Sequence, residues 1–212
     1  MNKEIYQLIK DRIIRGLYEP SQLINEKQLI DELEVSRVPI RESLARLEWE
    51  KLVTIVPRAG AIVSPIELGL IREVYQIRIM IEGFIGRIAT EKARKRHLND
   101  LSRVIKKARE IQKKGGTRED VISIDQKFRA VLAEAAGNKT LQEMSDYLYN
   151  ITIRLWHSKV GDEYFSHEWE KEIIQMEKTF TALKNKKPDE AEKARRGMIS
   201  EYVEELKRTF DF

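Results

Sequence analysis

The pattern of hydrophobic and polar positions changes character near Pro65. Before this residue, apolar side chains recur at helical spacing over three short stretches and then gather in two β-branched runs. After it, the helical spacing continues almost to the end of the chain. A repeat of about 3.6 residues predicts helices with one buried face, and β-branched runs predict strands. We therefore expect a mainly α protein with two domains, 1–66 and 67–212.

Three short helices are expected in the N-terminal domain. The first ends near Gly16, and Asn25, with Gln28 three residues later, forms a capping box that opens the second. Ser36 caps the third helix, and Pro39 lies in its first turn, where no intrahelical N–H bond is lost. Two short helices joined by a tight turn are typical of a helix-turn-helix.

The two β-branched runs cover 53–57 and 61–64 and are separated by Arg58-Ala59-Gly60. This spacing predicts a β-hairpin, which would form a two-stranded wing beside the helix-turn-helix. Gly60 removes a side chain at the expected tip, where a hairpin must approach a narrow groove, and Arg58 stands beside it.

The C-terminal domain is expected to be an all-α antiparallel bundle of about six helices. Short breaks that contain Gly, Asn, Asp or Pro separate the helical patterns, and such short breaks favour antiparallel neighbours. The expected helices cover 66–95, 98–114, 118–136, 139–160, 165–186 and 188–210.

Composition narrows the classes of function. The chain has no Cys, which excludes a disulfide framework, a Cys nucleophile and a Cys-based zinc finger. No apolar run reaches the ~18–20 residues of a membrane span, so we expect a cytoplasmic protein with no membrane partner. The formal net charge is +4, but residues 1–66 contain 10 basic and 10 acidic residues. DNA binding must therefore be argued from the positions of the charges.

The strongest candidate for DNA recognition is the start of the third helix. Arg37 and Arg41 are four residues apart and project from one helix face, at the end that enters the major groove in this motif. A guanidinium can bind guanine O6 and N7 together, which contributes about 1–3 kcal/mol of discrimination. Ser36 and the free amides of the first turn suit a phosphate. Lys27 and Arg46 are further candidates for phosphate contacts.

An isolated pair of arginines is more often a solvated helix face, but the complete order of elements favours DNA binding. Residues 5–64 resemble the DNA-binding domain of the GntR family. The matching positions are Ser36-Arg37, Pro39, Ile40-Arg41-Glu42-Ser43-Leu44 and Gly60. The resemblance assigns DNA contacts to Lys27, Ser36, Arg37, Arg41, Ala59 and Gly60. The chain departs from the family at Ser21, where glycine is usual, which implies a different turn geometry.

Residues 72–210 resemble the effector-binding domain of the FadR subfamily. The first signature is Arg78-x-x-x-Glu82. The second is Asp125-x-x-Phe128-Arg129-x-x-Leu132-x-x-Ala135-x-Gly137-Asn138-x-x-Leu141. The resemblance implies a ligand-controlled transcription regulator, in most cases a repressor. It also implies a homodimer, whose two-fold symmetry predicts a palindromic double-stranded operator.

Many members of this subfamily hold a divalent metal with an Asp, a His four residues later and two further His. Asp125 retains the first position, but Arg129 replaces the first His and has no lone pair for a metal. An alignment without gaps places Met176 and Met198 at the last two positions, and thioethers suit Cu(I) rather than Zn, Ni or Mn. We therefore expect no metal and no cofactor. His97 is expected at the surface, at the start of a helix.

We expect the permanent charge of Arg129 to replace the metal and to bind the carboxylate or phosphate of an anionic small-molecule effector. Asp125, four residues earlier, is its expected ion-pair partner. The alternative is that Asp125 and Arg129 form a structural ion pair in a pocket that has lost its metal site, with the methionines as ordinary core residues. The candidate effector-binding residues are Arg78, Asp125, Arg129, His157, Met176 and Met198.

Two other functions stay open. A non-specific architectural DNA-binding protein would bind any duplex equally, whereas a regulator prefers its operator by roughly 10³-fold or more. A metal-dependent enzyme on the helical bundle would turn a small molecule over. The missing metal ligands, and the lack of a glycine-rich phosphate loop or a Ser-His-Asp arrangement, argue against an enzyme.

Overall fold

The computed structural model describes the backbone of residues 2–159 and 162–210, and the side chains of residues 3–157 and 169–208. The chain divides into two compact units. The first contains Met1–Ile71 and Tyr149–Val160, and the second contains Arg72–Leu148 and Gly161–Phe212. One helix, α7 (Lys139–Lys159), therefore contributes residues to both units.

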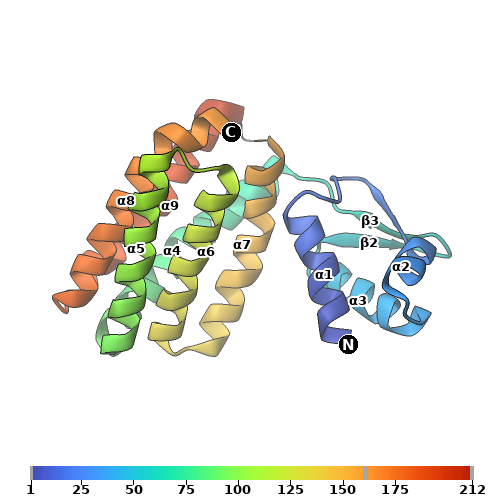
Figure 1. Cartoon of the computed structure of the whole chain (residues 1–212), viewed down its shortest axis with the longest axis horizontal. Coiled ribbons are helices and arrows are strands. Elements are labelled where there is room, and N and C mark those ends of the chain that lie inside the picture. The colour runs from blue at the N-terminus through green and yellow to red at the C-terminus, as the bar shows by residue number, and fades with distance from the viewer. Residues whose placement is uncertain (1, 160–161, 211–212) are drawn as a thin grey trace. The chain divides into compact units, whose positions relative to one another are not determined.

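The first unit begins with helices and a small sheet (Figure 1). The elements in chain order are α1 (Asn2–Ile14), β1 (Leu23–Asn25), α2 (Glu26–Leu33), α3 (Arg37–Trp49), β2 (Val53–Val56) and β3 (Gly60–Val63). The apolar faces of the three helices meet in one core. The side chains at its centre, each at most 2% exposed, are Ile9, Leu29, Ile40, Leu44 and Leu47. The predicted winged helix-turn-helix is thus confirmed.

The sheet contains three antiparallel strands in the order β1-β3-β2. β2 and β3 form the predicted hairpin, in which Val53 pairs with Val63. The sequence pattern did not predict β1, which pairs with β3 and places Ile24 opposite Ala61. Only the middle residue of this three-residue strand is buried, so it offers no alternation that could be read from the sequence.

Within the described ranges, six helices follow, as predicted. Their bounds are α4 (Leu68–Lys92), α5 (Lys95–Lys114), α6 (Arg118–Ala136), α7 (Lys139–Lys159), α8 (Asp162–Lys184) and α9 (Pro188–Phe210). In the second unit, α8 packs on α9 and α5, and α6 packs on α5 and α8. Gly115 and Gly137 end α5 and α6 in the left-handed conformation, which glycine adopts without a Cβ penalty.

His97 is not the surface residue that the sequence predicted. Its side chain is 4% exposed, and its Nδ1 accepts a hydrogen bond from the backbone N–H of Arg94 at 3.2 Å. The ring thus closes the first turn of α5 and packs inward, because a side chain at this position can reach back to the residue that caps the helix. None of the described helices combines the length and apolar composition that crossing a membrane requires.

Candidate nucleic-acid interface and effector site

Arg37 and Arg41 project from the exposed side of α3, with side chains that are 63% and 56% exposed. Both approach Glu26, the first residue of α2. The distance from Glu26 Oε2 is 3.2 Å to Arg41 Nε and 3.8 Å to Arg37 Nε. The two guanidinium groups are therefore held on the side of α3 that faces the start of α2, and both remain open to solvent.

The starts of α2 and α3 differ in how they are capped. Asn25 caps α2 as predicted, and its Oδ1 accepts hydrogen bonds from the backbone N–H of Lys27 at 2.8 Å and of Gln28 at 3.3 Å. Ser36 occupies the N-cap of α3 in an extended conformation, but its side chain makes no capping hydrogen bond. The Ser36 hydroxyl thus does not bond to the first backbone N–H groups of α3. A helix start that binds a phosphate needs these N–H groups to be available.

Arg46 lies on another side of α3, next to α1. Its guanidinium carbon is 3.9 Å from the centroid of the Tyr6 ring, and its Nε is 3.6 Å from Glu50 Oε1. Glu50 also accepts a hydrogen bond from the Tyr6 hydroxyl and forms an ion pair with Lys10 at 2.5 Å. Arg46 therefore packs on Tyr6 and pairs with Glu50, while its side chain stays 60% exposed.

The structure gives a different reason for the glycine of the wing from the predicted one. Gly60 is buried, begins β3 and has φ +140°. A Cβ at this position would lie 2.1 Å from the backbone oxygen of Ile24 in β1. Any side chain here would collide with β1, so the strand requires glycine whether or not DNA is bound. Arg58 is exposed between β2 and β3, with φ +66°.

A cluster of buried charges lies inside the second unit, centred on Glu82 of α4. This carboxylate is 2% exposed and accepts hydrogen bonds from Arg195 Nη2 at 2.5 Å, Ser145 Oγ at 2.7 Å and Arg129 Nε at 3.3 Å. Arg129 Nη2 also donates to Ser145 Oγ at 2.6 Å and lies 3.6 Å from Asp146 Oδ1. The ion pairs described for Arg129 are thus with Glu82 and Asp146.

Arg195 enters this cluster because α4 carries a glycine beside it. A Cβ on Gly86 would lie 2.8 Å from Arg195 Cγ and 3.1 Å from the backbone oxygen of Ala191. The Arg195 side chain is fully buried, and its Nη1 lies 3.0 Å from Met198 Sδ. Its Nε is a buried donor with no hydrogen-bond partner among the described residues.

The carboxyl groups of the cluster differ in the direction in which their pKa values are shifted. Burial alone would raise the pKa of Glu82, but the charges of Arg129, Arg195 and Arg78 outweigh burial and hold this pKa far below its ordinary value. Burial raises the pKa of Asp125 despite the same three arginines. Burial, together with the charge of Asp125, raises the pKa of Glu172 on α8.

Five of the six predicted effector residues are buried in the second unit: Arg78, Asp125, Arg129, Met176 and Met198, each at most 8% exposed. His157 belongs to the first unit, where its Cβ is 4.0 Å from the point at which a Cβ on Gly16 would lie. Sequence reasoning missed Glu172 and Arg195. It also gave no role to Glu82, although this residue stands in the quoted Arg78-x-x-x-Glu82 signature.

The residues at the metal positions of the family do not fit a divalent metal. Arg129 is bonded to Glu82 and Ser145, and the sulfur of Met198 lies against the Arg195 guanidinium. Cations and a thioether are not ligands for Zn, Ni or Mn. In the part of the chain that the structure describes, no three His, Asp or Glu side chains are grouped as metal ligands.

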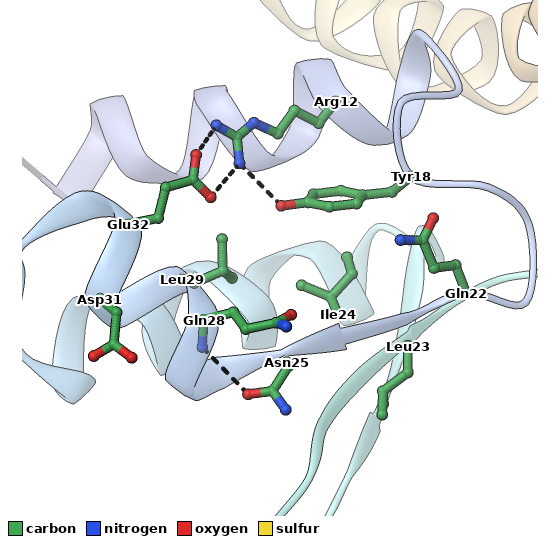
Figure 2. A pocket seen from close by; sticks show the side chains of 10 residues that line it. All are labelled: Arg12, Tyr18, Gln22, Leu23, Ile24, Asn25, Gln28, Leu29, Asp31 and Glu32. Carbon is green, nitrogen blue, oxygen red and sulfur yellow. Dashed lines mark hydrogen bonds and ion pairs between the residues drawn. The ribbon is translucent and has the colours of Figure 1, made fainter.

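The first unit contains a separate cleft of about 460 Å³ between α1, β1 and α2 (Figure 2). Arg12 supplies the guanidinium among its lining residues and is hydrogen-bonded to both carboxylate oxygens of Glu32 and to the Tyr18 hydroxyl. Asp31 adds a second acid to the lining. With two acids and one arginine in its lining, this cleft suits an anion less well than the Glu82 cluster, which gathers Arg78, Arg129 and Arg195.

Comparisons with known proteins cover both units. Residues 1–63 match the bacterial regulatory proteins of the gntR family, and residues 73–201 match the FCD domain. The regulator YdhC of Bacillus subtilis is 26% identical over 148 residues, which are 70% of this chain and 66% of that protein. The transcriptional repressor RspR of Escherichia coli is 25% identical over 211 residues, 98% of this chain and 90% of that protein.

The fold is similar to that of a solved structure, E. coli McbR/YncC. The TM-score is 0.85 at 20% identity, over 99% of this chain and 98% of that chain. The winged helix-turn-helix, the exposed arginines at the start of α3 and the two matched domains lead to one conclusion. The chain belongs to the GntR family and is a sequence-specific DNA-binding transcription regulator with an FCD effector domain.

Proposed function

We propose that this protein is a homodimeric repressor that binds a palindromic operator and is controlled by an anionic metabolite, which it binds without turnover. The observation that carries the proposal is that arginines gather at two places. Arg37 and Arg41 are exposed on the DNA-reading helix, whereas Arg129 and Arg195 are buried in the effector domain. RspR, which matches nearly the whole chain, is named as a repressor, and this supports the direction of regulation.

The DNA contacts that we propose follow from the chemistry of α3 and the wing. Arg37 and Arg41 read guanine, while the first amides of α3, with Ser36, hold a phosphate. Lys27, Arg46 and the wing segment from Arg58 to Gly60 add contacts to the DNA backbone. Glu26 keeps the two reading arginines in place before DNA arrives and is displaced when they bind bases.

The effector contacts that we propose follow from the buried cluster. Arg129 supplies permanent positive charge in place of a metal ion, in a site that also contains Arg78 and Arg195. The Nε–H of Arg195 has no partner among the described residues, and an oxygen of a carboxylate or phosphate would satisfy it. Met176 and Met198 provide an adaptable apolar wall. Asp125 contributes a carboxyl group whose raised pKa favours its neutral form.

An apolar stripe on α4 supports the homodimer. Ile77, Met80 and Phe84 lie on one face of this helix and are 48%, 62% and 48% exposed. Apolar groups of this size are rarely left in solvent when they lie side by side, and a dimer with two-fold symmetry would bury both copies of the stripe.

A binding selection on random duplex DNA, combined with native mass spectrometry, tests the proposal. We expect a dimer mass and an enriched palindrome, and a Phe84→Glu variant should shift the mass to that of a monomer. A panel of carboxylates and phosphate esters, screened by thermal shift and then added to the DNA complex, should include one compound that changes operator affinity. Equal binding to every duplex would instead indicate a non-specific architectural protein, and consumption of the compound would indicate an enzyme.

A further inference from the structure

Val38 occupies an unusual position on the DNA-reading helix. It is the second residue of α3, between Arg37 and Pro39, and is 62% exposed. Successive residues are separated by about 100° around a helix, so Val38 lies about 160° from the buried Ile40. The side chain therefore points directly away from the core of the first unit.

The folded unit gives no reason for an apolar residue here. Pro39 and Ile40 are buried and anchor the first turn of α3, whereas Val38 adds nothing to that core. A β-branched residue in a helix is also slightly less favourable than Ala, Glu or Lys. The apolar side chain of Val38 is therefore explained better by a partner than by folding.

The charges around Val38 indicate what the partner is. Arg37 and Arg41 both lean toward Glu26 of α2, so their guanidinium groups lie to one side of Val38. An apolar side chain beside two exposed arginines matches the major groove, where an apolar group can lie next to hydrogen-bond acceptors and phosphates. Thymine alone presents an apolar group there, its 5-methyl.

We propose that Val38 reads thymine, packing its methyl groups against the 5-methyl of a base in the operator beside the positions read by Arg37 and Arg41. This rests on the proposed placement of α3 in the major groove. Val38 is then a specificity-determining residue that distinguishes thymine from cytosine without a hydrogen bond. Burial of one methyl group corresponds to about three- to fivefold in affinity for each half-site.

Trp49, at the other end of α3, provides a matched control. It is also apolar and 87% exposed, but it follows Val38 by 11 residues, about 16 Å along the helix axis. That distance takes it away from the N-terminal turns that reach the bases in this motif. Removal of the Trp49 side chain should therefore leave thymine recognition unchanged.

The experiment replaces thymine by deoxyuridine, which removes only the 5-methyl group. An operator is first selected from random duplex DNA with the full-length wild-type protein, and each dT is then replaced in turn. We expect one or two positions in each half-site at which the replacement weakens wild-type binding by about three- to fivefold. The Val38→Ala variant should bind dT and dU equally at those positions. Trp49→Ala should keep the wild-type ratio, and Val38→Thr, which retains one methyl group, should give an intermediate ratio.

Three results would overturn the inference or its basis. If wild-type protein binds every dT and dU duplex equally, no thymine methyl is read. If Val38→Ala keeps the full dT/dU ratio, another residue reads it. If selection enriches no sequence at all, the proposed operator binding fails, and the role of Val38 with it. An unchanged melting temperature of Val38→Ala shows that the variant is folded, because this side chain is exposed.

Discussion

Two places in this protein use the same motif, a pair of arginines that share one glutamate, in opposite surroundings. On the winged helix, Arg37 and Arg41 share Glu26, and both guanidinium groups are more than half exposed. In the helical unit, Arg129 and Arg195 share Glu82, with exposures of 7%, 0% and 2%. The residue types are the same, but the exposure to water is not.

The difference decides what each pair can do. Exposed ion pairs contribute about 0–1 kcal/mol, so Glu26 can release its arginines to DNA at little cost. Loss of one partner from a buried pair costs about 3–5 kcal/mol, because the remaining charge stays buried without compensation. The Glu82 cluster is therefore part of the fold as well as of the proposed effector site, whereas the Glu26 pairs contribute little to stability and lie on the proposed DNA-binding surface.

The largest expected effect is on stability, at the buried glutamate. Glu82→Gln should lower the free energy of unfolding by about 3–5 kcal/mol, since it removes the buried negative charge that Arg129 and Arg195 share. Urea denaturation measures this change. Glu26→Gln is the matched control and should change stability by less than about 1 kcal/mol. Equal effects of the two substitutions would contradict the comparison.

The effect of Glu82→Gln on stability has a pH dependence with a defined sign. The pKa of folded Glu82 lies below its ordinary value of 4.5, so the native state favours the ionised form. Its contribution to stability is complete above pH 4.5 and is lost as the pH falls further. The stability gap between wild type and Glu82→Gln should therefore narrow as the pH is lowered below that value.

The second effect separates binding from stability. Arg41→Ala should weaken binding to the selected operator by about 1–3 kcal/mol, because an exposed guanidinium no longer reads its base. Its free energy of unfolding should stay within about 0.5 kcal/mol of wild type, as for other surface substitutions. Fluorescence anisotropy and urea titrations measure the two quantities. Arg129→Ala should instead lower the free energy of unfolding, because it removes a buried partner of Glu82. An Arg129→Ala protein as stable as wild type would contradict the difference between the exposed and the buried arginines.

A smaller effect is expected at Asp125, where we test whether a neutral side chain makes the folded protein more stable than the ionised carboxyl group does. Burial raises the pKa of Asp125, so its ionised form is disfavoured in the folded protein. Asp125→Asn removes that cost with little change in shape and should raise stability at pH 7 by on the order of 1 kcal/mol. The gain should disappear as the pH falls to 3.8, the ordinary value for Asp. Destabilisation at pH 7 would show that Asp125 is needed as a charge.

The smallest effect lies in the winged unit and does not involve charge. Ser21 has φ +68°, in the left-handed region that glycine adopts freely, and its backbone N–H donates to Val63 O at 2.9 Å. Ser21→Gly should raise the free energy of unfolding by about 0.5–1 kcal/mol, which would appear as a slightly higher melting temperature. Operator affinity should not change. A fall in melting temperature would show that glycine's extra freedom in the unfolded chain outweighs the strain at this turn.

The element order was predictable because the breaks between helices carry strong local signals. Gly115 and Gly137 end α5 and α6, and Pro188 begins α9, where the sequence placed these boundaries. β1 was not predictable, because its three residues acquire their conformation only by pairing with β3. The requirement for Gly60 depends on that pairing, so its reason was hidden as well.

The effector site was predictable only in part, because local sequence does not determine which charges are buried. Arg195 and Arg196 are neighbours in α9 with the same chemistry, yet the first is fully buried and the second is 46% exposed. Both side chains pack against glycines of α4, Arg195 against Gly86 and Arg196 against Gly83, but only Arg195 reaches the buried carboxylate of Glu82. Arg129 could be singled out because it interrupts a known ligand pattern, whereas Arg195 interrupts none.

The division of α7 between the two units has a consequence for how such proteins can be recombined. Tyr149–Val160 belong to the same unit as the winged helix, and Arg154 of this segment donates a hydrogen bond to the backbone oxygen of Ser64, just after the wing. The preceding residues of the same helix include Ser145 and Asp146, which contact Arg129 in the other unit. A gene fusion that joins only residues 1–71 to a foreign sensor would leave the last turns of this helix behind. The compact unit that contains the winged helix is thus assembled from two separate stretches of the sequence.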